Sequence, residues 1–220
     1  MTMKRFILLL IMFINIQPSY AGIKLGGTRV IIPSSVNAAQ MNIYNTSDYR
    51  PYLIQSWVED KNNKKTQSFI ITPPLFKLTG KKTNAIKIIA RDKFPENKES
   101  LFWLNVKSIP SSKKGVNDLL LVINTKIKLI YRPTSLSMSI KDAVEHISIT
   151  KKNNTLHINN QSPYYFSFYR INVGSYKLEK STMIAPFDKK TIALPKGVSG
   201  EISWSYINDF GGVSIGKKVD

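Results

Sequence analysis

The sequence contains no cysteine and only two histidines, His146 and His157. Without cysteine no disulfide can brace the chain, so its fold depends on an apolar core, for which 42% hydrophobic residues supply enough material. The potential metal ligands do not cluster at the spacing of a metal site. Phosphate-binding loops and His-Glu-x-x-His motifs are also absent from the sequence. We therefore expect no enzyme activity, no metal and no cofactor.

Long apolar runs are equally scarce, and the clearest one lies at the N-terminus. Residues 6–16 follow the cations Lys4 and Arg5, and Ser19-Tyr20-Ala21 places small residues where a signal peptidase reads. This pattern predicts a signal peptide over residues 1–21, and the alternative is an uncleaved N-terminal anchor. No later segment reaches about 18 continuous apolar residues, so we expect no membrane insertion of the mature chain.

The signal peptide makes a direct prediction about the exported protein. Cleavage after Ala21 should leave a mature chain of 220 − 21 = 199 residues that begins at Gly22. N-terminal sequencing of the exported protein tests this, and recovery of Met1 in the soluble fraction would contradict it.

Acidic residues are few, 14 against 32 lysines and arginines, and the net charge is +18. Such an excess attracts anionic partners, but an export signal argues against nucleic acid. Many lysines stand in pairs within polar, turn-like stretches, which is typical of solvated loops. A cationic protein that binds membranes or surface polysaccharide is an alternative, and strong salt dependence of vesicle binding would indicate it.

Amphipathic helices longer than one turn are missing as well, and nearly every segment has the pattern of a β-strand. Candidate strands cover residues 28–32, 40–44, 52–58, 69–72, 85–89, 100–106 and 119–131, then 146–149, 155–158, 164–171, 190–194 and 201–208. Turn residues separate these strands, and a break at residues 132–135 divides them into two series. We therefore predict an all-β fold with two sandwich domains of about 100 residues each.

The segment 117–131 is unusual because about fifteen residues pass without a strand breaker, whereas strands commonly have about five or six. Its first half is apolar at both odd and even positions, so both of its faces favour apolar contacts. It is either a central strand covered on both sides or an edge strand whose outer face is kept for a partner.

Seven motifs in order then resemble the PapD-like periplasmic chaperones of the chaperone–usher pathway. They are Gly27 to Ile31, Tyr52 to Glu59, Thr72 to Leu78, Glu99 to Val106, Asn124 to Pro133, Asn160 to Tyr165, and Ser205 to Gly212. The resemblance implies two immunoglobulin-like β-sandwich domains in a boomerang arrangement, here residues 22–137 and 138–220. It also implies a periplasmic protein that completes pilus subunits with its own strand and delivers them to an outer-membrane usher.

The resemblance further implies which residues act. Leu119, Leu121 and Ile123 match the groove-filling positions of the donor strand, which could also self-associate. We expect Leu120 and Val122, at the other parity, to face the domain's own core. Arg29 and Lys128 match the two cations that anchor the subunit's C-terminal carboxylate. In a regular strand Lys128 and the three apolar residues lie on opposite faces, so a bulge or strong twist is expected if both meet one subunit.

Two structural features are also implied by the resemblance. Lys87, Glu99 and Asp209 match an interdomain charge cluster, and Pro74 is the candidate cis-proline of the Thr-Pro-Pro turn. The competing function is a structural or adhesive β-sandwich surface protein, which would be found in assembled fibres and not only in a soluble periplasmic extract.

Overall fold

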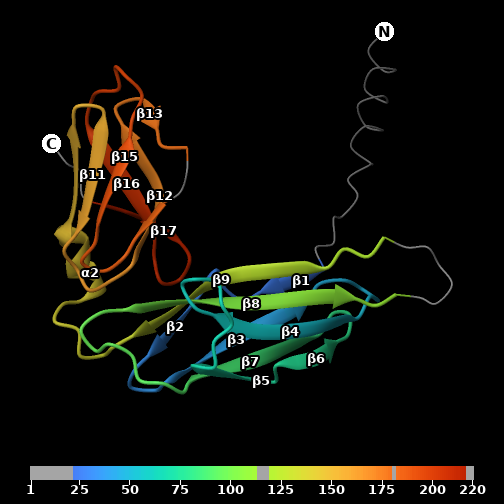
Figure 1. The fold of residues 1–220 in the computed structure, drawn as a ribbon. Helices are drawn as coiled ribbons and strands as arrows, with labels where there is room; N and C mark the ends of the chain where they lie inside the picture. Colours follow the sequence, from blue (N-terminus) through green and yellow to red (C-terminus); the bar gives the residue numbers. More distant parts are fainter. Residues whose placement is uncertain (1–21, 113–118, 180–181, 217–220) are drawn as a thin grey trace, which may run out of the picture.

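The computed structural model describes residues 22–112, 119–179 and 182–216, so the predicted signal peptide and its cleavage site lie outside the described residues. The described chain forms two β-sandwiches that meet at an angle and give the molecule an L shape (Figure 1). The prediction of an all-β protein with two sandwiches is therefore confirmed. No helix in the described part is long and apolar enough to cross a membrane.

The N-terminal sandwich consists of two sheets. The first has the order β1 (Ile23–Leu25), β3 (Ala38–Asn45), β7 (Thr83–Ala90), β5 (Phe69–Thr72). The second has the order β2 (Arg29–Pro33), β9 (Ile123–Arg132), β8 (Ser100–Pro110), β4 (Tyr52–Glu59), β6 (Leu75–Leu78). Alternating residues fill the core between them: along β4, Ile54, Ser56 and Val58 are buried, whereas Leu53 and Gln55 are exposed.

The C-terminal sandwich pairs a three-stranded sheet with a second one around its own apolar cluster. The first sheet has the order β10 (Ile147–Lys152), β11 (Thr155–Asn160), β15 (Lys189–Ala193). The second has the order β13 (Tyr176–Lys177), β12 (Phe166–Val173), β16 (Ile202–Ile207), β17 (Val213–Ile215), with β14 (Thr182–Ile184) paired to β12. A single turn of helix, α2 (Ile140–Ala143), and the 3-10 turn η1 (Val144–His146) precede β10.

The turn between β5 and β6 contains a cis peptide bond, but it is the Thr72–Pro73 bond and not the one before Pro74. Two consecutive prolines give two tertiary amides with similar intrinsic cis content, so the sequence offers no basis for choosing between them. In the folded chain the carbonyl of Pro74 accepts a hydrogen bond of 2.8 Å from the Ser56 amide of β4, which ties this turn to the neighbouring strand.

Candidate binding site at a strand edge and the interdomain cleft

Strand β9 has a neighbour along one edge and only a partial neighbour along the other. On one side β8 pairs with it continuously, from Ser108 opposite Ile123 to Ser100 opposite Tyr131. On the other side β2 runs parallel to it but pairs only from Lys128 onward. Within the described residues, the outer edge of β9 over 123–127 therefore has backbone groups without a strand partner, the kind of edge that recruits another strand.

The five apolar residues that precede and begin β9 are all exposed. The exposed fractions of Leu119, Leu121 and Ile123 are 85%, 68% and 59%, and those of Leu120 and Val122 are 37% and 47%. The expected long strand begins only at Ile123, and the segment 119–122 is not in a strand. The expectation that Leu120 and Val122 face the core is wrong, because the pairing of β8 with β9 ends at Ser108 and leaves no neighbouring strand to bury them.

The register of β9 is regular, so the expected bulge is not present between Ile123 and Lys128. Odd-numbered residues face the N-terminal core, since Ile127, Leu129 and Tyr131 all pack in it. Ile123 lies on this same side, whereas Lys128 lies on the opposite side. A partner strand added along the free edge would extend both sides of the sheet, and it could therefore meet both sets of residues without any bulge.

Arg29 and Lys128 are register partners on the adjacent strands β2 and β9. The Arg29 guanidinium reaches the C-terminal sandwich, where its Nη1 donates a hydrogen bond of 2.9 Å to the Ile207 carbonyl. Its buried Nε has no hydrogen-bond partner within residues 22–112, 119–179 and 182–216. The Lys128 ammonium lies 6.0 Å from the centroid of the Trp103 ring. The structure thus brings together the two predicted cations at the junction of the sandwiches.

The two cations are electrostatically frustrated. Burial lowers the pKa of Arg29, although the charges of Asp209 and Glu99 act in the opposite direction. Burial also lowers the pKa of Lys128, and the nearby positive charge of Arg29 adds to the effect. Among the described residues, no carboxylate forms an ion pair with either side chain. An incoming anion would relieve this repulsion and restore charge balance.

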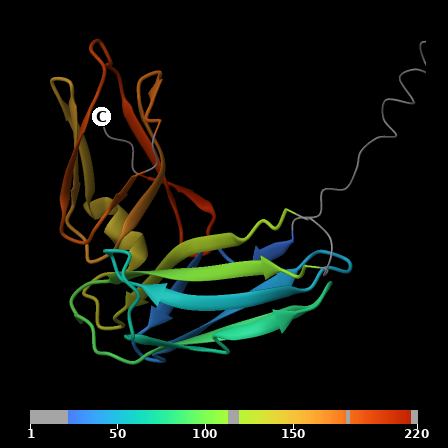
Figure 2. The ribbon, with the colours of Figure 1, turned by 45° about the vertical axis from the view of Figure 1, so that its right-hand side comes forward.

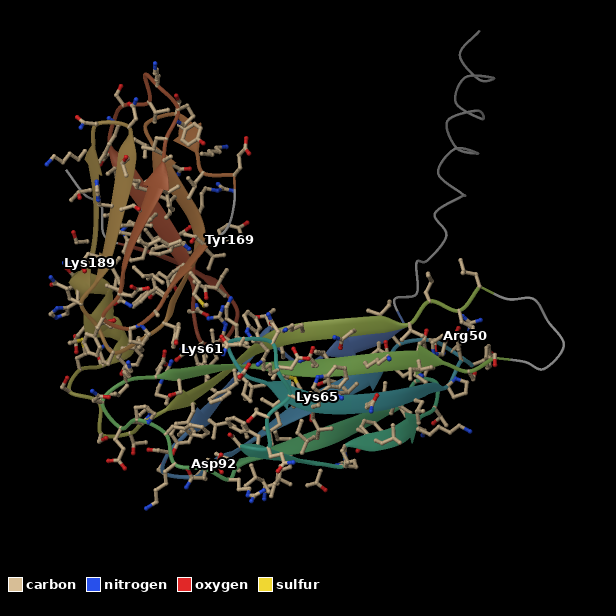
Figure 3. All side chains as sticks on the ribbon, in the orientation of Figure 1. Arg50, Lys61, Lys65, Asp92, Tyr169 and Lys189 are labelled. Atoms are coloured by element: carbon tan, nitrogen blue, oxygen red, sulfur yellow. The ribbon has the colours of Figure 1, made fainter. Side chains whose placement is uncertain are left out.

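The next lysine on the same face is in a different situation. Lys126 Nζ lies 2.6 Å from Glu59 Oε2 and donates a second hydrogen bond of 2.6 Å to Asn63 Oδ1. Hydrogen bonds from Lys126 and Trp57 lower the pKa of Glu59. Figure 3 shows Lys61 and Lys65 on this side of the sheet, with Lys61 nearer the C-terminal sandwich. Lys126 is thus neutralised within the protein, unlike Lys128.

A cluster of charged side chains joins the two sandwiches, and its cation is Arg132 and not Lys87. Arg132 Nε lies 2.6 Å from Glu99 Oε1, and its Nη1 and Nη2 donate to the two carboxylate oxygens of Asp209 at 2.6 and 2.9 Å. Glu99 Oε2 accepts a hydrogen bond of 2.7 Å from the Tyr165 amide. One arginine therefore binds carboxylates of both sandwiches, which a lysine cannot do with the same fork geometry.

Lys87 lies on β7 in the other sheet of the N-terminal sandwich, where it is exposed and opposite Gln40. No ion pair joins it to Glu99 or Asp209 in the described part of the chain. The prediction that it belongs to the cluster is therefore wrong. Arg132 stands inside the Asn124 to Pro133 motif and at the break of residues 132–135, but neither pattern indicates a partner for its guanidinium.

Burial raises the pKa of Glu99, although Arg132 and the Tyr165 amide oppose the shift. Burial acts to lower the pKa of Arg132, but the hydrogen bonds and charges of Asp209 and Glu99 outweigh it and raise that pKa. The guanidinium therefore stays charged, and Glu99 is held as a hydrogen-bond acceptor.

The β16–β17 loop that carries Asp209 lies close against the N-terminal sandwich (Figure 2). Gly211 has φ +83°, and a Cβ at this position would lie 2.6 Å from the Thr28 hydroxyl oxygen. Thr28 directly precedes Arg29, so glycine at position 211 lets the loop approach the cation pair closely.

The segment Gly212-Val213-Ser214-Ile215-Gly216 matches the letters of the Gly-x-Ser-x-Gly pattern of hydrolase nucleophiles. That pattern requires a sharp turn from a strand into a helix. Ser214 instead lies in the middle of β17 opposite Tyr206, and its hydroxyl accepts a hydrogen bond of 3.0 Å from Asn208. The match therefore does not identify a nucleophile.

Comparison with protein-family models finds two matches. Residues 22–137 match the model of the pili and flagellar-assembly chaperone PapD N-terminal domain, and residues 142–218 match the pili assembly chaperone PapD C-terminal domain. Among curated proteins, the chain is 41% identical over 210 residues to chaperone protein FocC of Escherichia coli, covering 93% of this chain and 92% of FocC. It is 39% identical over 199 residues to chaperone protein FimC of Escherichia coli K12, covering 88% and 82%.

Solved structures give the same result. The periplasmic chaperone SfaE is 38% identical with a TM-score of 0.76, covering 90% of this chain and 98% of SfaE. The solved complex of the Salmonella enterica SafA pilin with the SafB chaperone contains a chain that is 30% identical to this protein, with a TM-score of 0.82. The match covers 92% of this protein and 98% of that chain.

Proposed function

Because the chain belongs to the PapD-like family of pilus-assembly chaperones, which are not enzymes, we propose that it captures pilus subunits by donor-strand complementation and delivers them to an outer-membrane usher. The observation that carries this proposal is the free edge of β9 together with the exposed apolar residues beside it. A subunit whose own sheet lacks a strand has the complementary defect, an open backbone edge above an apolar groove.

The apolar residues supply the driving force of this capture. Leu119, Leu121 and Ile123 alternate along the chain. If this segment pairs with the subunit as an extended strand, all three side chains project from one face of it, toward the apolar groove of the subunit. Their burial would contribute about 5–9 kcal/mol in total, at about 1.5–3 kcal/mol for each side chain. Ordering the segment 119–122 into a strand opposes part of this gain. The solved SafB–SafA complex supports a pilin as the partner, because SafB is a relative at 30% identity.

The two cations set the position of the subunit along the strand. A C-terminal carboxylate placed between Arg29 and Lys128 would gain charge-assisted hydrogen bonds at a site already short of negative charge. Strand pairing alone permits a slip along the edge, whereas one anchored end fixes the register. When no subunit is present, a second copy of the chaperone would cover the same edge. Removal of residues 1–21 would release the mature protein into the periplasm.

Replacement of Lys128 by alanine should reduce capture sharply and leave the fold intact. The side chain is half-buried but makes no ion pair within the described residues, so its loss removes chiefly a contact with the Trp103 ring. Without it the subunit carboxylate would remain poorly compensated in the cleft. The measurement is co-purification of a pilus subunit from periplasmic extract, with thermal unfolding of the free variant in parallel.

A matched control is Lys65→Ala, because the Lys65 ammonium also lies over a tryptophan, 5.0 Å from the centroid of the Trp57 ring, but away from Arg29. Lys65→Ala should retain capture, and both variants should melt within a few degrees of the parent. Unfolding of Lys128→Ala would make the residue structural and contradict its role as an anchor.

A further inference from the structure

A cavity of about 200 Å³ lies beside Arg29, between the two sandwiches. Ile130 of β9 contributes to it from the N-terminal sandwich, and Ile140, Tyr206 and Phe210 contribute from the C-terminal sandwich. The cavity therefore exists only because the two sandwiches are held at their observed angle.

The cavity has several apolar wall residues and an excess of positive charge, because Arg29, Arg132 and Lys141 line it against the single carboxylate of Asp209. Arg132 and Asp209 pair with each other at 2.6 Å, and Arg132 also binds Glu99. Arg29 has no such carboxylate partner in the described chain, and its Nε is buried without a hydrogen bond. A ligand that matches this lining has an apolar body and an anionic end near Arg29.

The volume limits how large that body is. Pockets that bind drug-sized molecules measure about 300–1,000 Å³, so this cavity is too small for a cofactor. An apolar cavity of about 150 Å³ is enough to hold a benzene ring. One aromatic or large aliphatic side chain therefore fits the space.

We propose that this cavity receives the side chain of the last residue of the pilus subunit while its carboxylate is held by Arg29 and Lys128. A terminal residue carries both groups on one Cα, which matches a cavity whose wall includes the anchoring arginine. The cavity then makes the identity of the subunit's last residue a determinant of which subunits are bound. This inference rests on the proposed function only in naming the occupant, because the lining alone indicates a ligand with an apolar body and an anionic end.

The test uses small molecules in place of a subunit, with the mature chaperone titrated and its NMR chemical shifts followed. N-acetyl-L-phenylalanine should bind roughly 10-fold more tightly than N-acetylglycine, since its ring is removed from water. N-acetyl-L-phenylalanine amide, which has no charge, should bind more weakly than the acid. Equal affinity for the phenylalanine and glycine compounds would overturn the proposal.

Two variants tie the preference to the cavity. The Phe210→Ala variant should fold, because the Phe210 side chain is 97% exposed. It removes one side of the cavity and should therefore reduce the preference for N-acetyl-L-phenylalanine over N-acetylglycine. The control is Phe187→Ala, another exposed phenylalanine, which does not line the cavity and should leave the preference unchanged. Ile140→Trp fills the space and should abolish the preference, and its folding is checked by circular dichroism. An unchanged preference in Phe210→Ala and in folded Ile140→Trp would contradict the assignment.

The outcome separates this proposal from the proposed function. If subunits are captured equally whatever their last residue, the role of the cavity is wrong and the chaperone function stands. If N-acetyl-L-phenylalanine binds as expected but no subunit is captured, the cavity is a carboxylate site and the chaperone function fails.

Discussion

Leu121→Asp should abolish subunit capture and leave the free protein folded. Leu121 is 68% exposed and lies outside every strand, so a carboxylate there remains in water in the free protein. In the proposed complex the same side chain enters the apolar groove of the subunit, where an unpaired charge is very costly. Circular dichroism of the variant and co-purification of a pilus subunit measure the two effects.

The neighbouring Leu120→Asp is the matched control. It makes the same chemical change one position earlier. In an extended strand, residue 120 projects from the face opposite to Leu119 and Ile123. The Leu120 side chain is 37% exposed, so the Leu120→Asp variant should also fold. This variant should retain much more of the subunit capture than Leu121→Asp. If Leu120→Asp is instead the variant that loses capture, the groove-facing side has been misassigned. Unfolding of both variants would show that the segment is structural.

Arg132→Ala should destabilise the protein by about 3–5 kcal/mol, because it leaves a buried carboxylate without its cation. The carboxylate is that of Glu99, whose side chain is 1% exposed. In the described part of the chain, the Tyr165 amide is the one other donor to it. At roughly 2–4 °C for each kcal/mol in a chain of this size, the melting temperature should fall by about 6–20 °C. Urea unfolding and calorimetry measure the loss.

Lys87→Ala is the control, because this exposed lysine lies outside the cluster and its loss should change stability by less than about 0.5 kcal/mol. A second test is rescue. Glu99→Gln in the Arg132→Ala background replaces the stranded charge with a neutral amide that can still accept from Tyr165, and it should recover part of the stability. A small effect of Arg132→Ala, or a large effect of Lys87→Ala, would contradict the assignment.

The sequence predicted the members of the site better than their arrangement. Arg29 and Lys128 were named from motifs, and the structure places them opposite each other on paired strands. The family resemblance implied Lys87, which lies outside those motifs, for the interdomain cluster, and the structure uses Arg132 instead. The two cases differ because the pairing of β2 with β9 lies within one sandwich, whereas the cluster depends on how the two sandwiches meet.

The sequence by itself determined that this chain is a β protein with two sandwiches, because alternation of apolar residues and turn chemistry are local properties that each segment carries with it. Only the tertiary structure decided where β9 loses its neighbours, so that Leu120 and Val122 are exposed despite their strand-like pattern. Only the tertiary structure joined Arg132 to Asp209, which are 77 residues apart, and formed the partly open cavity between the sandwiches. Such contacts arise from the packing of distant segments, and no local periodicity specifies them.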